Sequence, residues 1–167
     1  MLERTTGLGL ADLLGRELWQ PLGAEVDGCM AIDRAGTCQA DGGLNAALSD
    51  YARFGQMYLD EGFFNGRQVV PAAWVAQCRT GDRAAFAPLY GERFAAFPNA
   101  CYSRQWWVLD AKTGRHAALG VFGQMIYIDP PSGVVAVKLS SWPDFLNDPM
   151  RVSTIRALEA MTQALGR

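Results

Sequence analysis

The side chains that could carry nucleophilic catalysis in this sequence are its serines, its cysteines, Lys112, Lys138 and His116. An amide or ester hydrolase that works without a metal needs a nucleophile, a general base and an oxyanion hole. No serine has a lysine three residues later, and none lies in a Gly-x-Ser-x-Gly turn. His116 could act as a base, but it follows a polar turn, so we expect a plain exposed side chain. The sequence therefore shows no recognisable pair of nucleophile and base.

The four cysteines do not indicate a metal site or a catalytic thiol. None of them forms a Cys-x-x-Cys pair, and His116 is the only histidine, so we expect no zinc. A Cys-His pair is possible but has no supporting electropositive setting. Gly7-Leu8-Gly9 follows no strand, so no dinucleotide cofactor is expected either. Free thiols favour a reducing compartment, which here means the cytoplasm.

Composition restricts the classes of partner. The chain has 167 residues, half of them hydrophobic, and a formal net charge of −2. There is no basic stripe for nucleic acid and no apolar run of the roughly 20 residues that a membrane span needs, and the N-terminus lacks the apolar region of a signal peptide. The length is sufficient for one hydrophobic core. The many aromatic residues favour such a core or an aromatic-lined cleft.

Helical periodicity dominates the first half of the sequence, about 1–80. Leucines at helical spacing predict a helix over 8–20, which Pro21 should end. A second helix is predicted over about 46–61 and closed by Gly62, and a third should begin at Pro71. Residues of about 80–101 are expected to form one long loop.

From about residue 102 to residue 140 the apolar period changes to two, which indicates strands. One strand is predicted over 102–109, and another over 134–140. Between them, 116–129 is either one long strand or two strands with a bulge at Gly120 and Gly123. Turns at 112–115 and 130–133 make the pairing antiparallel, and an amphipathic helix follows at about 148–166. The order predicts an α+β fold, with a three-stranded sheet that has one edge free to pair outside the chain.

Several short runs, taken in order, resemble the β-lactamase-related, or penicillin-recognising, serine hydrolases. They are Glu-Arg-Thr-Thr-Gly at 3–7, Trp-Gln-Pro-Leu-Gly at 19–23, Gly-Gly-Leu at 42–44, Asp-Tyr-Ala-Arg-Phe-Gly-Gln-Met at 50–57, Val-Pro at 70–71, Trp-Val at 74–75, Gly-Val-Phe-Gly-Gln at 120–124 and Asp-Pro at 129–130. Gln-Trp-Trp at 105–107 and Lys-Leu-Ser-Ser at 138–141 are similar to the subgroup of 6-aminohexanoate-dimer hydrolases.

The resemblance implies that residues 1–167 form the C-terminal portion of one β-lactamase-like domain, an antiparallel sheet with packed helices. In that family the catalytic Ser-x-x-Lys comes early and Tyr-x-Asn or Tyr-x-Ser follows it, and neither motif occurs here. Met1 would then be an internal methionine of a longer enzyme. That enzyme would cleave a small-molecule ester or linear amide through an acyl-serine, and this chain would be inactive by itself.

The resemblance also implies which residues of this chain would line the active site. The family's third motif falls on Ala118-Leu119-Gly120, where no cation stands, and the backbone N–H of Val121, next to Gly120, would be one oxyanion-hole donor. The substrate-binding candidates are Asn45, Tyr102, Trp107, Leu119 and Phe122. The apolar candidates could equally be sheet core, Asn45 could be a helix N-cap, and Gly120 could mark a bulge for packing.

A non-enzymatic role remains open as the alternative. The chain would then pair with a separately made N-terminal half, form a homo-oligomer, or use its free strand edge for another partner.

Overall fold

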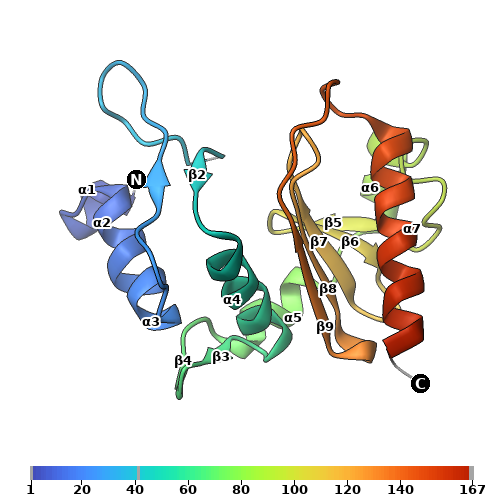
Figure 1. The fold of residues 1–167 in the computed structure, drawn as a ribbon, viewed down its shortest axis with the longest axis horizontal. Coiled ribbons are helices and arrows are strands. Elements are labelled where there is room, and N and C mark those ends of the chain that lie inside the picture. The colour runs from blue at the N-terminus through green and yellow to red at the C-terminus, as the bar shows by residue number, and fades with distance from the viewer. Residues whose placement is uncertain (1, 41, 166–167) are drawn as a thin grey trace.

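The computed structural model describes residues 2–40 and 42–165 and has three layers (Figure 1). A five-stranded sheet lies between helix α4 (Leu48–Leu59) on one face and helix α7 (Asp148–Leu165) on the other. Helices and antiparallel strands are segregated along the chain, which is the α+β architecture predicted from the sequence. The predicted end of the last helix, residue 166, lies outside the described residues.

The sheet is antiparallel throughout, and its strands lie side by side in chain order. The strands are β5 (Cys101–Ser103), β6 (Trp106–Asp110), β7 (Arg115–Leu119), β8 (Met125–Asp129) and β9 (Val134–Lys138). The turns at 112–115 and 130–133 are where the sequence predicts them. Strand β9 is an edge, because it pairs only with β8 among the described residues.

The sequence predicted three strands, but the sheet has five, because a turn divides each of two predicted strands. Arg104 and Gln105 adopt φ values of 47° and 70° and join β5 to β6 in a two-residue hairpin, so 102–109 is not one strand. Two-residue turns of this kind usually contain Asn or Gly, and neither residue occurs here. Residues 116–129 form two strands, as one of the alternatives held, but Gly120 and Gly123 lie in the turn between them rather than in a bulge.

The two faces of the sheet carry separate hydrophobic clusters because side chains alternate along each strand. In β8, Met125 and Tyr127 pack on the α7 side with Ile155, whereas Ile126 and Ile128 pack on the α4 side. Helix α4 approaches the sheet closely at Gly55, where a Cβ atom would lie 2.5 Å from a methyl group of Val135. Residues far apart in sequence are thereby held in one body.

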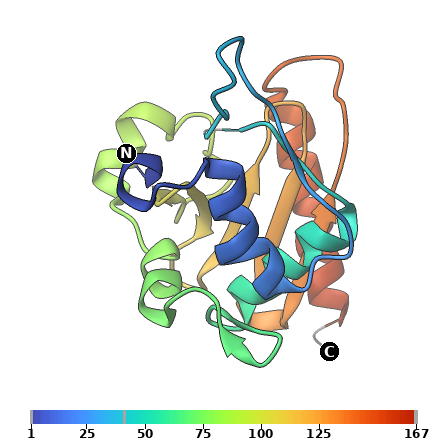
Figure 2. The ribbon, with the colours of Figure 1, turned by 90° about the vertical axis from the view of Figure 1, so that its left-hand side faces the viewer.

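The rest of the first half of the chain packs around α4, and α5 (Ala72–Cys78) reaches the sheet beside it. Besides α5, this part contains α1 (Leu2–Thr6), α2 (Leu10–Leu14), a π-helical segment (Gly15–Trp19), α3 (Gln20–Leu22), and the short strand pairs β1 (Cys29–Met30) with β2 (Leu44–Asn45) and β3 (Phe63–Phe64) with β4 (Arg67–Gln68). Figure 2 shows the helices of the first 22 residues in front of α4, on which α3 packs. Helix α4 ends at Leu59, two residues before the predicted end, and both Glu61 and Gly62 have positive φ, 55° and 82°; the Gly62 N–H closes the helix by donating to the Met57 carbonyl at 2.8 Å.

Two predictions about helix boundaries were wrong. The first helical run does not end at Pro21 but continues to Leu22, where Gly23 adopts a left-handed conformation. A π-helical segment precedes Pro21, so the regular hydrogen-bond ladder is already interrupted there. Residues 80–101 are not one loop, because helix α6 (Arg83–Tyr90) lies within them. The Asp82 side chain caps this helix by accepting from the N–H groups of Ala84 and Ala85.

No helix among the described residues is both long and apolar enough to cross a membrane.

Candidate functional site

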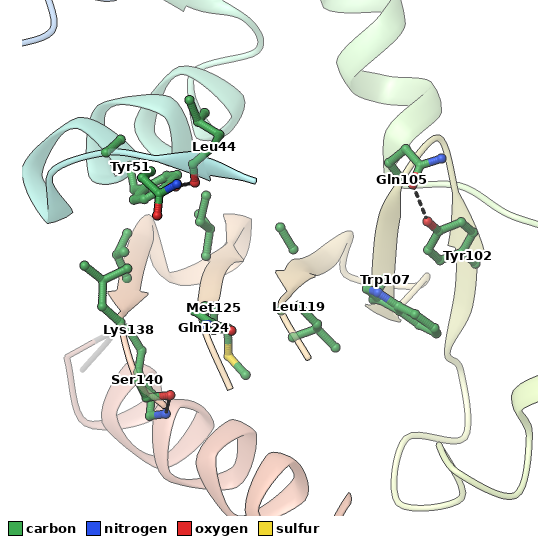
Figure 3. A pocket seen from close by; sticks show the side chains of 17 residues that line it. Leu44, Tyr51, Tyr102, Gln105, Trp107, Leu119, Gln124, Met125, Lys138 and Ser140 are labelled. Atoms are coloured by element: carbon green, nitrogen blue, oxygen red, sulfur yellow. Dashed lines mark hydrogen bonds between the residues drawn. The ribbon is translucent and has the colours of Figure 1, made fainter. Parts of the chain in front are cut away.

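A pocket of about 560 Å³ opens where β7, β8 and β9 meet the start of α4 (Figure 3). Its walls come from three parts of the chain: the β2 segment with α4, the β5–β6 hairpin, and the ends of β7 to β9. The lining residues are Leu44, Asn45, Ala46, Tyr51, Tyr102, Gln105, Trp107, Ala118, Leu119, Gly120, Gln124, Met125, Ile126, Val137, Lys138, Leu139 and Ser140.

The structure brings most of the predicted site residues together at this pocket. Asn45, Tyr102, Trp107, Leu119 and Gly120 line it. The other two predicted residues lie apart from it. Val121 lines an adjoining cavity of about 100 Å³, which shares its wall at Trp107, Leu119 and Gly120 with the larger pocket. Phe122 lines neither cavity, and its ring packs against Phe145 with centroids 6.0 Å apart.

The turn from Gly120 to Gln124 holds the peptide that the family resemblance assigns to the oxyanion hole. The Gly120 N–H donates to the Gln124 carbonyl at 2.8 Å, and the Phe122 N–H donates to the Gln124 side-chain oxygen at 3.2 Å. The Val121 N–H donates to no group among residues 2–40 and 42–165. A fixed turn with a free N–H can donate to an oxygen brought from outside.

The segment that follows β9 fixes the carbonyls of the same turn. The Leu146 N–H donates to the Val121 carbonyl at 2.9 Å, and the Trp142 N–H donates to the Phe122 carbonyl at 3.0 Å. The ammonium of Lys138 donates to the Gly123 carbonyl at 3.0 Å. These bonds hold three carbonyl groups of the turn. The directions of the N–H groups in the same peptides are therefore fixed as well.

Aromatic rings form the wall on the β5–β6 side. The Trp107 ring stacks on Phe94 at 5.0 Å and meets the Tyr102 ring edge-on at 4.8 Å. The Tyr102 hydroxyl donates to the Gln105 side-chain oxygen at 2.9 Å, a bond drawn in Figure 3. Tyr102, Trp107 and Leu119 also pack against the core cluster beneath α7. They therefore stand at the boundary between core and pocket.

The opposite wall is held by α4. The Tyr51 hydroxyl donates to the Leu44 carbonyl at 2.5 Å and so ties β2 to the helix. Buried Asp50 accepts from the Glu25 N–H at 2.8 Å and from Arg53 at 2.9 Å, which fixes the loop before β1. Asn45 does not cap α4: Ala47 stands at the cap position, and the Asn45 amide donates to the Gly43 carbonyl instead.

Lys138 and Ser140 are pocket residues that sequence reasoning did not select. The Lys138 ammonium donates to the Ser140 hydroxyl at 2.6 Å and lies 4.7 Å from the centre of the Trp142 ring. Burial lowers the pKa of Lys138. The sequence offered two signals, since Lys138 is one of only two lysines and stands at the end of the predicted last strand.

His116 is not the exposed side chain that the sequence predicted. It lies fully buried on β7, with its ring 4.8 Å from Trp106 and 6.5 Å from Tyr58. Nδ1 lies 2.7 Å from the Gly114 carbonyl, and burial lowers the pKa of His116 to about 4. It lines none of the cavities described, so it does not serve as a base there.

The cysteines occur as free thiols, with Cys29 exposed and Cys78 and Cys101 buried. Burial raises the pKa of both buried thiols, which makes them poor nucleophiles. Within the described part of the chain, no three side chains of His, Cys, Asp or Glu gather as metal ligands would.

Comparisons with known proteins point to the same family as the order of the short sequence runs. No family model matches the sequence. The chain is 38% identical over 145 residues to 6-aminohexanoate-dimer hydrolase of Paenarthrobacter ureafaciens, a match that covers 86% of this chain and 36% of the relative. The chain thus spans about a third of that relative's length.

Solved structures give the same relationship in three dimensions. A Bacillus anthracis protein described as a 6-aminohexanoate-dimer hydrolase aligns with a TM-score of 0.83 and 29% identity, over 98% of this chain and 40% of that one. Simvastatin synthase of Aspergillus terreus aligns with a TM-score of 0.70 and 15% identity, over 99% of this chain and 51% of that one, a likeness of fold alone. In sequence and in fold, the chain corresponds to the C-terminal portion of the β-lactamase-like serine hydrolases.

Proposed function

We propose that this chain supplies one wall of the active site of a hydrolase for linear amides or esters, of the 6-aminohexanoate-dimer hydrolase and carboxylesterase type. The observation that carries this proposal is the free N–H of Val121 on a fixed turn beside a pocket with apolar and aromatic walls. The similarity to a relative of that name supports the substrate class.

In the proposed reaction the substrate carbonyl lies against the turn, and its oxygen accepts a hydrogen bond from Val121. A serine attacks the carbonyl, an acyl-serine forms and the amine or alcohol leaves, and water then releases the acid. The serine, its lysine and the partner tyrosine are not among these 167 residues, since no Ser-x-x-Lys or Tyr-x-Asn or Tyr-x-Ser occurs in them. Trp107, Leu119 and Tyr102 bound the space for the acyl chain, and Asn45 faces it from the other wall.

The chain alone is therefore expected to be inactive, because loss of the nucleophile unit costs about 10⁶ in turnover. The test mixes the chain with p-nitrophenyl acetate and follows the release of nitrophenolate. We expect no burst from the chain alone. The same assay is repeated after co-expression with the part of the Paenarthrobacter ureafaciens enzyme that this chain does not match, which should restore hydrolysis. A burst from the isolated chain, or no hydrolysis from an assembled complex, would contradict the proposal.

A second candidate is a non-enzymatic binding or complementing module. The observation that favours it is the edge strand β9, which pairs only with β8 among the described residues and offers backbone groups to another strand. A complex that assembles but does not hydrolyse any ester or amide would favour this candidate over the first.

A further inference from the structure

We propose that the side-chain amide of Gln124 binds the substrate, with its nitrogen Nε2 donating a hydrogen bond to the oxygen of the reacting carbonyl. The inference rests on the proposed function, because it adds a second donor to the same site. It goes further in assigning this role to a side chain, whereas the proposed function uses only the backbone N–H of Val121 on this turn.

The turn itself fixes the orientation of the Gln124 amide. The oxygen Oε1 accepts from the Phe122 N–H at 3.2 Å. A backbone N–H can only donate, so the atom of the amide that faces it is the oxygen and not the nitrogen. The acceptor of the side chain is therefore occupied within the turn, and its donors are directed away from Phe122.

The nitrogen of this amide is free to bind a ligand. Nε2 carries two N–H donors, and it donates to no group in the described part of the chain. Among the described residues, the buried side-chain nitrogens without a partner belong to arginines and to His116, so Nε2 of Gln124 is accessible. Gln124 lines the larger pocket, where Figure 3 shows it beside Met125. A donor in this position can bind an acceptor oxygen of a ligand.

Gly120 brings the amide of Gln124 close to the peptide that carries the Val121 N–H. A Cβ atom on Gly120 would lie 2.4 Å from Oε1 and 3.2 Å from the amide carbon of Gln124, so the side chain folds over the turn only because Gly120 has none. Gly120 also lines both cavities, whereas Gln124 lines the larger one and Val121 the smaller one. A carbonyl oxygen placed against Gly120 can therefore be approached by a donor from each side.

Two donors on one oxygen suit the proposed reaction. Negative charge develops on the carbonyl oxygen when the serine attacks, and each donor that is already aimed at this oxygen stabilises the transition state. Side-chain amides serve in this way beside backbone N–H groups. Gln124 would thus support the Val121 N–H from a side chain whose position the turn already holds.

The alternative is that Gln124 only ties the turn together, in which case its oxygen matters and its nitrogen does not. Gln124→Glu separates the two roles. A carboxylate still accepts from the Phe122 N–H, but it has no N–H to donate. Gln124→Met removes both the acceptor and the donors.

The experiment follows binding to the isotope-labelled 167-residue chain by two-dimensional NMR, so that it does not depend on a nucleophile. The probes are N-butylpentanamide and its thioamide, in which a sulfur, a weaker acceptor, replaces the carbonyl oxygen. We expect the amide to shift the side-chain NH₂ signals of Gln124, which are those missing from the spectrum of Gln124→Glu. This variant should bind the amide about fivefold more weakly, the net effect of one neutral hydrogen bond, and the thioamide almost as before.

Gln105→Glu is the matched control. Gln105 lines the same pocket from the β5–β6 hairpin, and its side-chain oxygen is likewise occupied, by the Tyr102 hydroxyl. The same substitution there adds the same charge to the pocket away from the turn, and it should leave the affinity for both probes unchanged. Thermal unfolding of each variant shows that it is folded before binding is compared.

The backbone signal of Val121 separates this inference from the proposed function. An amide that shifts Val121 but not the side chain of Gln124 would overturn the inference and leave the proposed function standing. Unchanged affinities in Gln124→Glu together with weaker binding in Gln124→Met would also overturn it, because only the tie would then matter. If neither signal shifts, the inference and the proposed function fail together.

Discussion

His116 is buried in the protein interior as a neutral imidazole. Its Nδ1 lies against the Gly114 carbonyl, so the proton sits on that nitrogen, and Nε2 has no hydrogen-bond partner among the described groups. The ring packs between Tyr58 and Trp106, and a charge there would have no solvation. The polar turn before it, Lys112 to Arg115, suggested that His116 is exposed. The sequence does not reveal that Trp106 and Tyr58 pack against its ring.

This burial makes the stability of the chain dependent on acid pH. The pKa of His116 is about 4 in the folded chain and 6.5 as a free side chain. Between these values the unfolded chain binds a proton that the folded chain does not, so stability falls as pH falls through this window. The total loss is about 3 kcal/mol.

The measurement is urea unfolding between pH 7 and 4 for the native chain and for His116→Gln. The chain has no second histidine, so the difference between the two pH profiles isolates this group. We expect a shallower profile for the variant. Parallel profiles would show that other groups cause the pH dependence.

At the scale of elements, the turn between β7 and β8 is the most constrained connection near the pocket. Gly123 adopts φ of 86°, and a Cβ atom there would lie 2.2 Å from the Trp142 ring. The glycine thus lets the segment after β9 pack on the turn and bond to its carbonyls. The sequence identified Gly120 and Gly123 as a special place in the chain, but it did not identify Trp142 as the side chain that needs the space.

Substitution of this glycine tests whether the contact matters. Gly123→Ala should lower the free energy of unfolding by about 2–4 kcal/mol, from backbone strain and from the clash with Trp142. Gly133→Ala is the matched control, because Gly133 also has positive φ, 65°, but open space around its Cβ position. It should cost only about 1 kcal/mol. Equal losses in guanidinium unfolding would mean that Trp142 moves aside without cost.

Elements with strong local signals were predicted well, and elements set by tertiary packing were not. Helix α4 and the turns at 112–115 and 130–133 carry their apolar period or turn residues in the sequence itself. Helix α6 was missed because Pro88 argued for a loop, although the Asp82 cap could have indicated its start. Five of the seven predicted site residues line one pocket, whereas Lys138 enters it from a strand that the sequence did not link to the site.

At the scale of the whole molecule, the sheet ends at β9 while both of its faces are covered by helices. An edge strand that is unpaired among the described residues is a place where another strand adds with little rearrangement. The second candidate function uses this edge, because a strand of a partner could pair with β9.

A partner that binds only the folded chain should stabilise it. Addition of the complementary part of the Paenarthrobacter ureafaciens enzyme at 100 times its dissociation constant should raise the free energy of unfolding by about 2.7 kcal/mol. The measurement is a thermal scan at increasing partner concentration, with unrelated protein as the control. A melting temperature that does not change with concentration would argue against any complementing role.

The chain order of the sheet has a consequence for how the molecule folds. Strands β5 to β9 each pair with the next strand along the chain, and the connections are short, so closing the sheet loses little loop entropy. Helix α4 instead reaches β8 and β9 across the whole of the intervening chain. The last part to be synthesised is therefore the part that can form first. We expect the first part to dock onto it afterwards, in the reverse of the order of synthesis.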